Sequence, residues 1–395
     1  MNQLADSSPE MALLLASLQW PFDERAIEDR ARQVESWPAF IGLCQRHQVI
    51  PLVVRSLGGC SPGVLPRREM RQLRLLGSMI TDKNEEFVRE LELVHASLIE
   101  AGIEVLHYKG AVAAQYLYDD FHMRQFGDID LLFPKTRSKE LLAVFARLGY
   151  KTSPGMPGEH DYLNRFEKDF LLTRGPFILE PHWSLTARRI SINVDYNSLW
   201  ARSVPMNLQS TTLRTFGPED MLCVLSICGS KGQWQRLQMI TDVAQMLRGH
   251  SDLDWGKCML RAEQSGCARM VRLGLFCAIE WFDAPVPEEV RAWVVSDKQL
   301  PKLVSSICEV LLLDDPKSAW GGLSPASFNR LIMGLHDGAK NKAIYLIRST
   351  TSPSVVHLRR FPLPSFLRFL YRIIVPVYDY VGVPIVRRTR SLLSE

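Results

Sequence analysis

The chain has 395 residues, which is long enough for two or three domains of about 100–200 residues each. Its 46% hydrophobic and 23% charged content is typical of an ordinary soluble globular protein, and the formal net charge is +4. No uninterrupted apolar run reaches the roughly 18 residues that a membrane span needs. The apolar stretch 11–18 follows acidic residues, so we predict an amphipathic helix there rather than a signal peptide.

Eight cysteines are scattered along the chain without any Cys-x-x-Cys pair. Most of them lie in apolar segments with a helical pattern, where a free thiol packs as a small hydrophobic group. We therefore predict buried, reduced cysteines in a cytoplasmic protein, rather than disulfides or a zinc site.

The first predicted elements are helical. Residues 1–64 show short helical patterns interrupted by prolines. After Pro66, apolar residues recur at steps of three, four and seven from Leu73 to Leu98, which predicts one long helix ended by Gly102.

The pattern then changes to that of a β-turn-helix-β unit followed by further strands, which is typical of a mixed sheet. The predicted elements are a strand at 103–108, a turn at Lys109–Gly110, a helix at 111–118, a strand at 128–133, a helix at 138–148, and strands at 166–172 and 177–182.

From Pro218 onward the chain is predicted to be helical up to about residue 313, without internal repeats. The predicted helices are 218–230, 234–248, 256–266, 268–282, 287–295 and 298–313. We therefore expect an α+β protein with a mixed-sheet core flanked by helices. The expected divisions are an N-terminal helical segment (1–64), the core (65–185), a helical domain (186–335) and a basic C-terminal tail (336–395).

The tail concentrates positive charge. Residues 340–395 contain ten basic and two acidic residues, a charge of +8, so the rest of the chain carries about −4. Aromatic residues alternate with arginines at 358–374, a composition that fits an anionic membrane surface, a nucleic acid, or packing against the body. Four prolines break any long helix there, so we favour a packed or partner-binding tail. No recognised nucleic-acid motif is present, so nucleic acid is not expected as a partner.

The residues that carry chemistry are acids at strand ends. Asp128 and Asp130 are two apart, so a strand projects both to one face and points Ile129 into the core. Two carboxylates held so close repel each other unless a cation lies between them, and Mg²⁺ prefers such oxygen ligands. Glu180, on a later strand, would complete a two-metal site.

Positive and flexible residues accompany these acids. Gly110 allows close approach of the backbone to a phosphate, and a helix beginning there points its free N–H groups at it. Lys109 and Arg124 would neutralise phosphate charge. Each motif alone has an ordinary explanation: an Asp-x-Asp pair is usually solvated, and His182 alone is more often a structural histidine. The prediction depends on all of them occurring in order within one sheet.

Together these residues resemble the nucleotidyltransferase superfamily of DNA polymerase beta, and more closely a group of uncharacterised bacterial nucleotidyltransferase family proteins. The resemblance covers about residues 40–285. The matching segments are Lys109–Ala111, Arg124 with Gly127–Leu132, Glu180–Trp183, and Cys228–Leu237 followed by Asp242.

The resemblance adds Lys231 and Arg236 as candidate phosphate contacts, beside the alternative of a solvated helix face. Trp234 is predicted to be a packing residue that joins the helical domain to the sheet. The group carries histidines where this chain has Cys228 and Gly232, which puts the role of those histidines in doubt. All three acids are retained.

The resemblance implies metal-dependent transfer of a nucleoside monophosphate from an NTP to a hydroxyl, in a cleft between sheet and helical domain. Mg²⁺ or Mn²⁺ would bind Asp128, Asp130 and Glu180, with Glu180 as third ligand or general base, and His182 is a candidate acceptor contact. The candidate nucleotide-binding residues are Lys109, Gly110, Arg124, Gly127, Lys231 and Arg236. Kinase-like phosphotransfer and a non-catalytic nucleotide- or peptide-binding role remain alternatives, and the acceptor is not identified.

Overall fold

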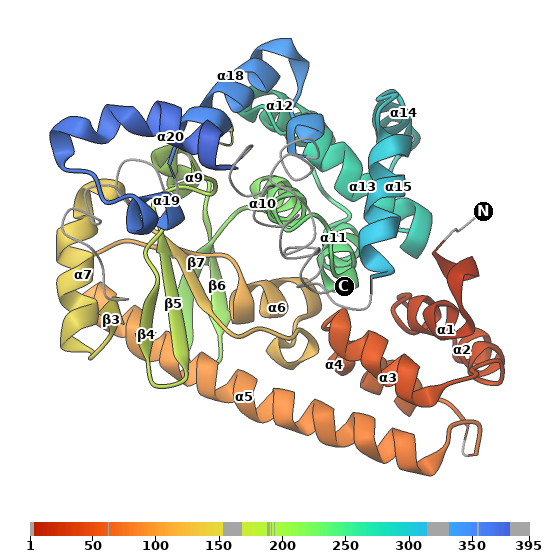
Figure 1. Cartoon of the computed structure of the whole chain (residues 1–395). Helices are drawn as coiled ribbons and strands as arrows, with labels where there is room; N and C mark the ends of the chain where they lie inside the picture. Colours follow the sequence, from red (N-terminus) through yellow and green to blue (C-terminus); the bar gives the residue numbers. More distant parts are fainter. Residues whose placement is uncertain are drawn as a thin grey trace, which may run out of the picture.

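The computed structural model describes residues 4–61, 63–152, 168–187, 190, 192, 194–313, 332–353 and 355–379. Its centre is a five-stranded mixed sheet with helices around it, which makes the protein α+β as predicted (Figure 1). The strands are β1 (Leu106–His107), β2 (Ile129–Leu132), β3 (Lys151–Thr152), β4 (Leu172–Arg174) and β5 (Phe177–His182), in the order β1-β2-β5-β4-β3.

Only one neighbouring pair in this sheet is parallel. β2 runs parallel to β5, with Asp130 beside Glu180 and Leu132 beside His182, whereas the other pairs are antiparallel. The predicted strand at 166–172 begins outside the described residues. Within them the regular strand starts only at Leu172, and Asp169 forms an isolated bridge to His182.

The long helix predicted after Pro66 is confirmed as α5 (Arg67–Glu100). Met70 and Leu73 near its start belong to one hydrophobic core, and Phe87 to Leu98 near its end belong to another. Figure 1 shows it passing below the sheet and reaching the N-terminal helices. A single helix therefore connects the two cores.

Helices on either side of α5 in the sequence share the first core. The N-terminal ones are α1 (Pro9–Ser17), α2 (Glu24–Ala31), α3 (Trp37–Arg46) and α4 (Ile50–Gly58). The C-terminal ones are α10 (Pro218–Lys231), α11 (Leu237–Gly249), α12 (Trp255–Ser265), α13 (Ala268–Phe282), α14 (Glu288–Val295) and α15 (Leu300–Leu311). Pro38 and Pro51 lie in the first turns of α3 and α4, where proline starts a helix well.

The second core lies under the sheet. It is formed by the end of α5, by α6 (Gly110–Tyr118), by α7 (Ser138–Arg147) and by the inward faces of the strands. A two-stranded hairpin that the sequence pattern did not predict, β6 (Val204–Leu208) and β7 (Thr211–Thr215), adds Leu208 and Leu213 to this core.

The remaining described elements include α9 (Tyr196–Ala201) and the tail elements α18 (Gly338–Thr351), α19 (Val355–Arg360), η4 (Ser365–Leu370) and α20 (Tyr371–Val377). All eight cysteines are free, and each is buried or half-buried. Within the described ranges, no helix is long and apolar enough to cross a membrane.

Candidate active site

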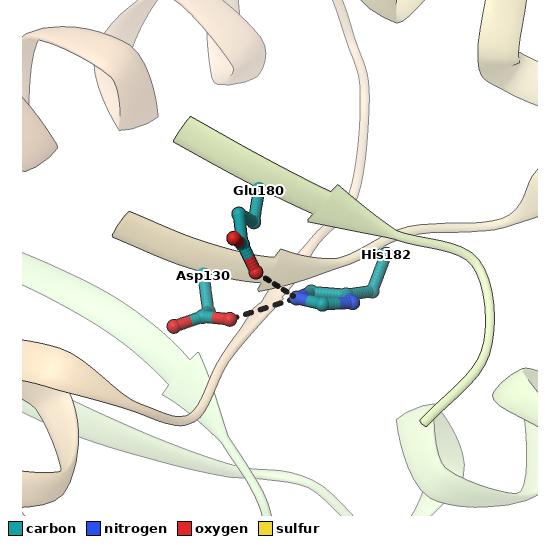
Figure 2. Close-up of side chains that lie close together, drawn as sticks. All are labelled: Asp130, Glu180 and His182. Carbon is teal, nitrogen blue, oxygen red and sulfur yellow. Dashed lines mark hydrogen bonds and ion pairs between the residues drawn. The ribbon is translucent and has the colours of Figure 1, made fainter. Parts of the chain in front are cut away.

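Three side chains converge where β2 and β5 lie side by side. The parallel register places Asp130 beside Glu180, and residues two apart in a strand share a face, so His182 projects to the same side as Glu180. Ligand atoms of Asp130, Glu180 and His182 all lie within 4.8 Å of one another (Figure 2). This group can hold a metal ion.

Asp130 is the most enclosed of these groups, with a side chain that is 0% exposed. Its Oδ1 lies 2.6 Å from Lys109 Nζ and 2.7 Å from His182 Nε2. Burial alone would raise the pKa of Asp130, but Lys109 and His182 outweigh that effect and hold the pKa below its ordinary value. Asp130 is therefore an ionised carboxylate, and its buried Oδ2 has no hydrogen-bond partner among the described residues.

His182 is completely buried, and burial lowers its pKa to about 3, so the ring is neutral near pH 7. A 2.7 Å contact to the ionised Asp130 requires a proton on Nε2. Nδ1 then accepts a hydrogen bond from Lys168 Nζ, 3.3 Å away, while Lys168 also forms an ion pair with Asp169. His182 thus holds Asp130 on one side and Lys168 on the other.

Asp128 lies outside the three-residue group but interacts with it electrostatically. Burial and the nearby carboxylates Asp130 and Glu180 together raise the pKa of Asp128 to about 6, against the lowering effect of Lys109. The side chain is half-buried and lines a cavity. Of the predicted acids, Asp130 and Glu180 are therefore neighbours. Asp128 is a third carboxylate, close enough for the charges of both to raise its pKa.

This cavity has a volume of about 540 Å³ and lies between the loops around β1 and β2 and the helices α10 and α11. Its wall is rich in cations. The basic lining residues are Lys83, Lys109, Arg124, Lys168, Lys231 and Arg236. The acids in the lining are Asp128 and Asp242. Such a surplus of positive charge favours an anionic ligand with several charges.

The sequence pattern missed Lys168 and Lys83. Lys168 comes directly after a segment outside the described residues, and its backbone carbonyl accepts a hydrogen bond from the Trp183 amide. Burial and the neighbouring cations Lys231 and Lys109 together lower the pKa of Lys168 to about 7. No motif marked this residue. Its only signal was its place on the strand predicted next to Glu180.

The turn before α6 requires glycine. Gly110 has a φ of 55°, and a Cβ atom there would lie 3.1 Å from the carbonyl oxygen of Asp128. Both the backbone conformation and this close approach disfavour any side chain. Gly127 also lines the cavity. A Cβ atom there would lie 2.8 Å from Lys83 Nζ, so the absence of a side chain leaves room for that cation.

Three predicted phosphate contacts make specific protein contacts. Arg124 forms a buried ion pair with Asp242 of α11, with 3.0 Å between Nε and Oδ2. Lys231 Nζ donates to the carbonyl of Leu185 at 2.7 Å, and Arg236 donates to the side chain of Gln48 at 2.9 Å. All three line the cavity, so the alternative of a solvated helix face does not describe Lys231 and Arg236.

The two positions that differ from the resembling group lie at the end of α10. Cys228 lines the cavity, and a Cβ at Gly232 would come within 2.7 Å of Met239 Cε. Trp234 is 1% exposed, and a Cβ at Gly229 would lie 2.4 Å from its ring. Trp234 is therefore a packing residue as predicted, but its ring lies against Gly229 of α10 and Gly274 of α13 in the helical core and does not join the helices to the sheet.

Residues 33–283 match a protein family described as "Uncharacterised nucleotidyltransferase". The chain belongs to this family. Nucleotidyltransferases are transferases of phosphorus-containing groups, so membership implies a nucleotide substrate. The match covers α3 through α13 and so contains both the sheet and the helices that enclose the cavity.

Comparisons with individual proteins add little to this family assignment. No curated protein matches the chain. A solved structure of ANT(2")-Ia in complex with adenylyl-2"-tobramycin is similar over 53% of this chain and 96% of its own, with 14% sequence identity and a TM-score of 0.27. At those values the likeness supports no conclusion about this nucleotidyltransferase.

Proposed function

We propose that this protein transfers a nucleoside monophosphate from an NTP to a hydroxyl group of an acceptor, with release of pyrophosphate. The observation that carries the proposal is that the carboxylates of Asp130 and Glu180 lie beside a cavity lined by six basic side chains. Carboxylates suit a divalent cation and the basic wall suits a triphosphate, and both are needed for this reaction.

The donor set fits a hard divalent cation such as Mg²⁺ or Mn²⁺. Asp130 Oδ2 is buried, ionised and without a hydrogen-bond partner, which is costly unless a cation occupies the space beside it. Glu180 is 29% exposed and can reach the same space. We assign the cation to Asp130 and Glu180, with Asp128 from the cavity side. When bound, the cation would polarise the phosphates and lower the pKa of the attacking hydroxyl.

The chain's own residues then have distinct tasks. Lys109 and His182 fix Asp130 in its ionised form. With its proton on Nε2 and its side chain fully buried, His182 acts as a support for Asp130, not as the acceptor contact that the sequence suggested. Lys168 and Lys231 lie on the cavity wall, where their charges would stabilise the triphosphate.

The start of α6 contributes a second source of positive potential. The helix begins at Gly110, and its first N–H groups have no partners within the helix. Lys109 precedes it with an extended backbone, so the turn presents both a side-chain cation and free amides to the cavity. This arrangement suits a phosphate group.

Transfer is tested with NTPs labelled separately at the α and γ positions, incubated with the protein, Mg²⁺ and a cell extract as the source of acceptor. We expect the product to carry the α label and not the γ label. The rate of transfer should fall at least 100-fold in Asp130→Asn and in Glu180→Gln. Glu104→Gln, an exposed carboxylate before β1, is the matched control and should retain full transfer. Label from the γ position would instead show kinase-like phosphotransfer.

A binding role without catalysis is favoured by one observation, the ion pair between Lys109 and Asp130 at 2.6 Å. A lysine that neutralises the carboxylate reduces its attraction for a cation. Calorimetry separates the two candidates: nucleotide binding that is unchanged by Mg²⁺ or Mn²⁺ would support the binding role, whereas metal-dependent binding would support transfer.

A further inference from the structure

The end of the described tail has a small core of its own. The 3-10 helix η4 runs directly into α20, and Tyr371 and Val375 on one side of this run are buried against Leu358 of α19. The Tyr371 hydroxyl donates to the carbonyl of Phe361 at 2.6 Å, which closes the unit. These residues form a cluster separate from the two larger cores.

The opposite side of the same run is apolar and open to solvent. Phe366, Phe369, Ile373 and Val377 are 76%, 61%, 63% and 54% exposed. They are spaced by three, four and four residues, so they form one stripe along the helical run. Exposing such a contiguous stripe to water is unfavourable, and contiguous apolar surface of this kind marks an interaction site.

The segment that carries this stripe is basic. Between residues 338 and 379 the sequence has seven basic residues and one acid, Asp379. Asp379 lies 3.1 Å from His357, and a single acid leaves the seven basic residues in large excess. Arg372 is exposed within the helical run, and α18, which carries Lys340 and Lys342, packs against α20.

We propose that this helical tail binds peripherally to the surface of an anionic membrane. The stripe of Phe366, Phe369, Ile373 and Val377 would enter the boundary between headgroups and acyl chains, and the basic residues would face the headgroups. A second copy of the chain would bring like charges together, and a nucleic acid would leave the apolar stripe without a partner. An anionic lipid surface satisfies both the charge and the apolar area.

Vesicle sedimentation with the full chain tests this proposal. Binding to vesicles of phosphatidylcholine with about 30% phosphatidylglycerol should exceed binding to phosphatidylcholine alone by at least tenfold, and should weaken at high salt. The triple variant Phe366→Ser, Phe369→Ser and Ile373→Ser should lower binding at least tenfold. Leu75→Ser with Met79→Ser removes equally exposed apolar side chains from α5, at 62% and 60% exposure, and should leave binding unchanged.

Other outcomes would overturn the proposal. One is equal binding to neutral and anionic vesicles, or binding that the triple variant retains. Another is a wild-type dimer that the triple variant converts to a monomer, because the stripe would then pair two copies. Preference for RNA over vesicles would likewise contradict it. An unchanged melting temperature in the triple variant shows that loss of binding does not come from misfolding.

Discussion

Lys109 and Asp130 form a buried pair that neither residue could sustain alone. The side chain of Asp130 is completely buried, and that of Lys109 is 27% exposed. Removing one partner of such a pair leaves an uncompensated charge, which typically costs about 3–5 kcal/mol of folding free energy. Each charge is therefore tolerated in the interior only because the other accompanies it.

This pair gives the first prediction. Lys109→Met should lower the free energy of unfolding by about 3 kcal/mol, and the double variant with Asp130→Asn should recover most of that loss because no unpaired charge remains. Urea unfolding of the two single variants and the double variant measures this coupling. Additive losses would show that Lys109 and Asp130 do not depend on each other.

Gly110 gives a prediction that separates backbone strain from crowding. Gly110→Ala should cost about 2 kcal/mol of stability, because it combines a φ of 55° with a Cβ 3.1 Å from the Asp128 carbonyl oxygen. Gly175→Ala is the matched control, with a φ of 54° and nothing within 4 Å, and should cost about 1 kcal/mol. Thermal unfolding compares them. Equal losses would mean that the approach to Asp128 is not tight.

At the scale of single elements, the strongest local patterns gave correct predictions. The period of the apolar residues placed α5, α10, α13 and the strands β2 and β5 within a few residues of their observed bounds. The α11 helix begins at Leu237, three residues later than predicted, because Gln233 and Trp234 adopt positive φ angles in the turn before it.

Features that depend on long-range pairing could not be predicted. The strands of the hairpin β6–β7 are short and polar on one side, so their sequence pattern is like that of a loop. Their pairing with each other is what makes them strands. The sequence pattern suggested that Asp130 and Glu180 would be neighbours, but not that His182 and Lys109 would enclose Asp130. Such contacts are set by strand register and by the helices that close over the sheet.

The packing of Trp234 against α10 gives a prediction about a helix interior. Alanine usually stabilises a helix relative to glycine by about 0.5–1 kcal/mol. Gly229→Ala should instead destabilise the protein by about 1–3 kcal/mol, because its Cβ would lie 2.4 Å from the buried Trp234 ring. Gly42→Ala in α3 meets nothing within 4 Å and should be neutral or stabilising. Opposite signs in calorimetric unfolding are the expected result.

For the whole molecule, buried neutral histidines make stability depend on pH. His47, His107 and His182 each have a pKa lowered to about 3 by burial. Below pH 6.5 the unfolded chain binds protons at these sites and the folded chain does not. The histidines therefore contribute their full stability above about pH 6.5, and this contribution falls as the pH decreases towards 3. Asp128, with a pKa raised to about 6, opposes this in part.

The net expectation is a loss of about 3 kcal/mol between pH 7 and pH 5.5, at about 1.2 kcal/mol for each histidine. His107→Gln should reduce this loss by about 1.2 kcal/mol, roughly two fifths of it, because the unfolded chain then has one fewer histidine to protonate. His107 lies on β1 and pairs with His95 at 3.1 Å. Urea unfolding at the two pH values measures it. A stability that is equal at both would contradict the buried, neutral state of these rings.

The central claim is that the carboxylates of β2 and β5 and the basic cavity form one nucleotide site. A crystal structure with Mn²⁺ and a non-hydrolysable NTP tests it most directly. We expect the triphosphate against Lys109, Lys168 and Lys231, and the metal at about 2–2.3 Å from oxygens of Asp130 and Glu180. A nucleotide bound elsewhere, or a metal that contacts neither carboxylate, would contradict the account.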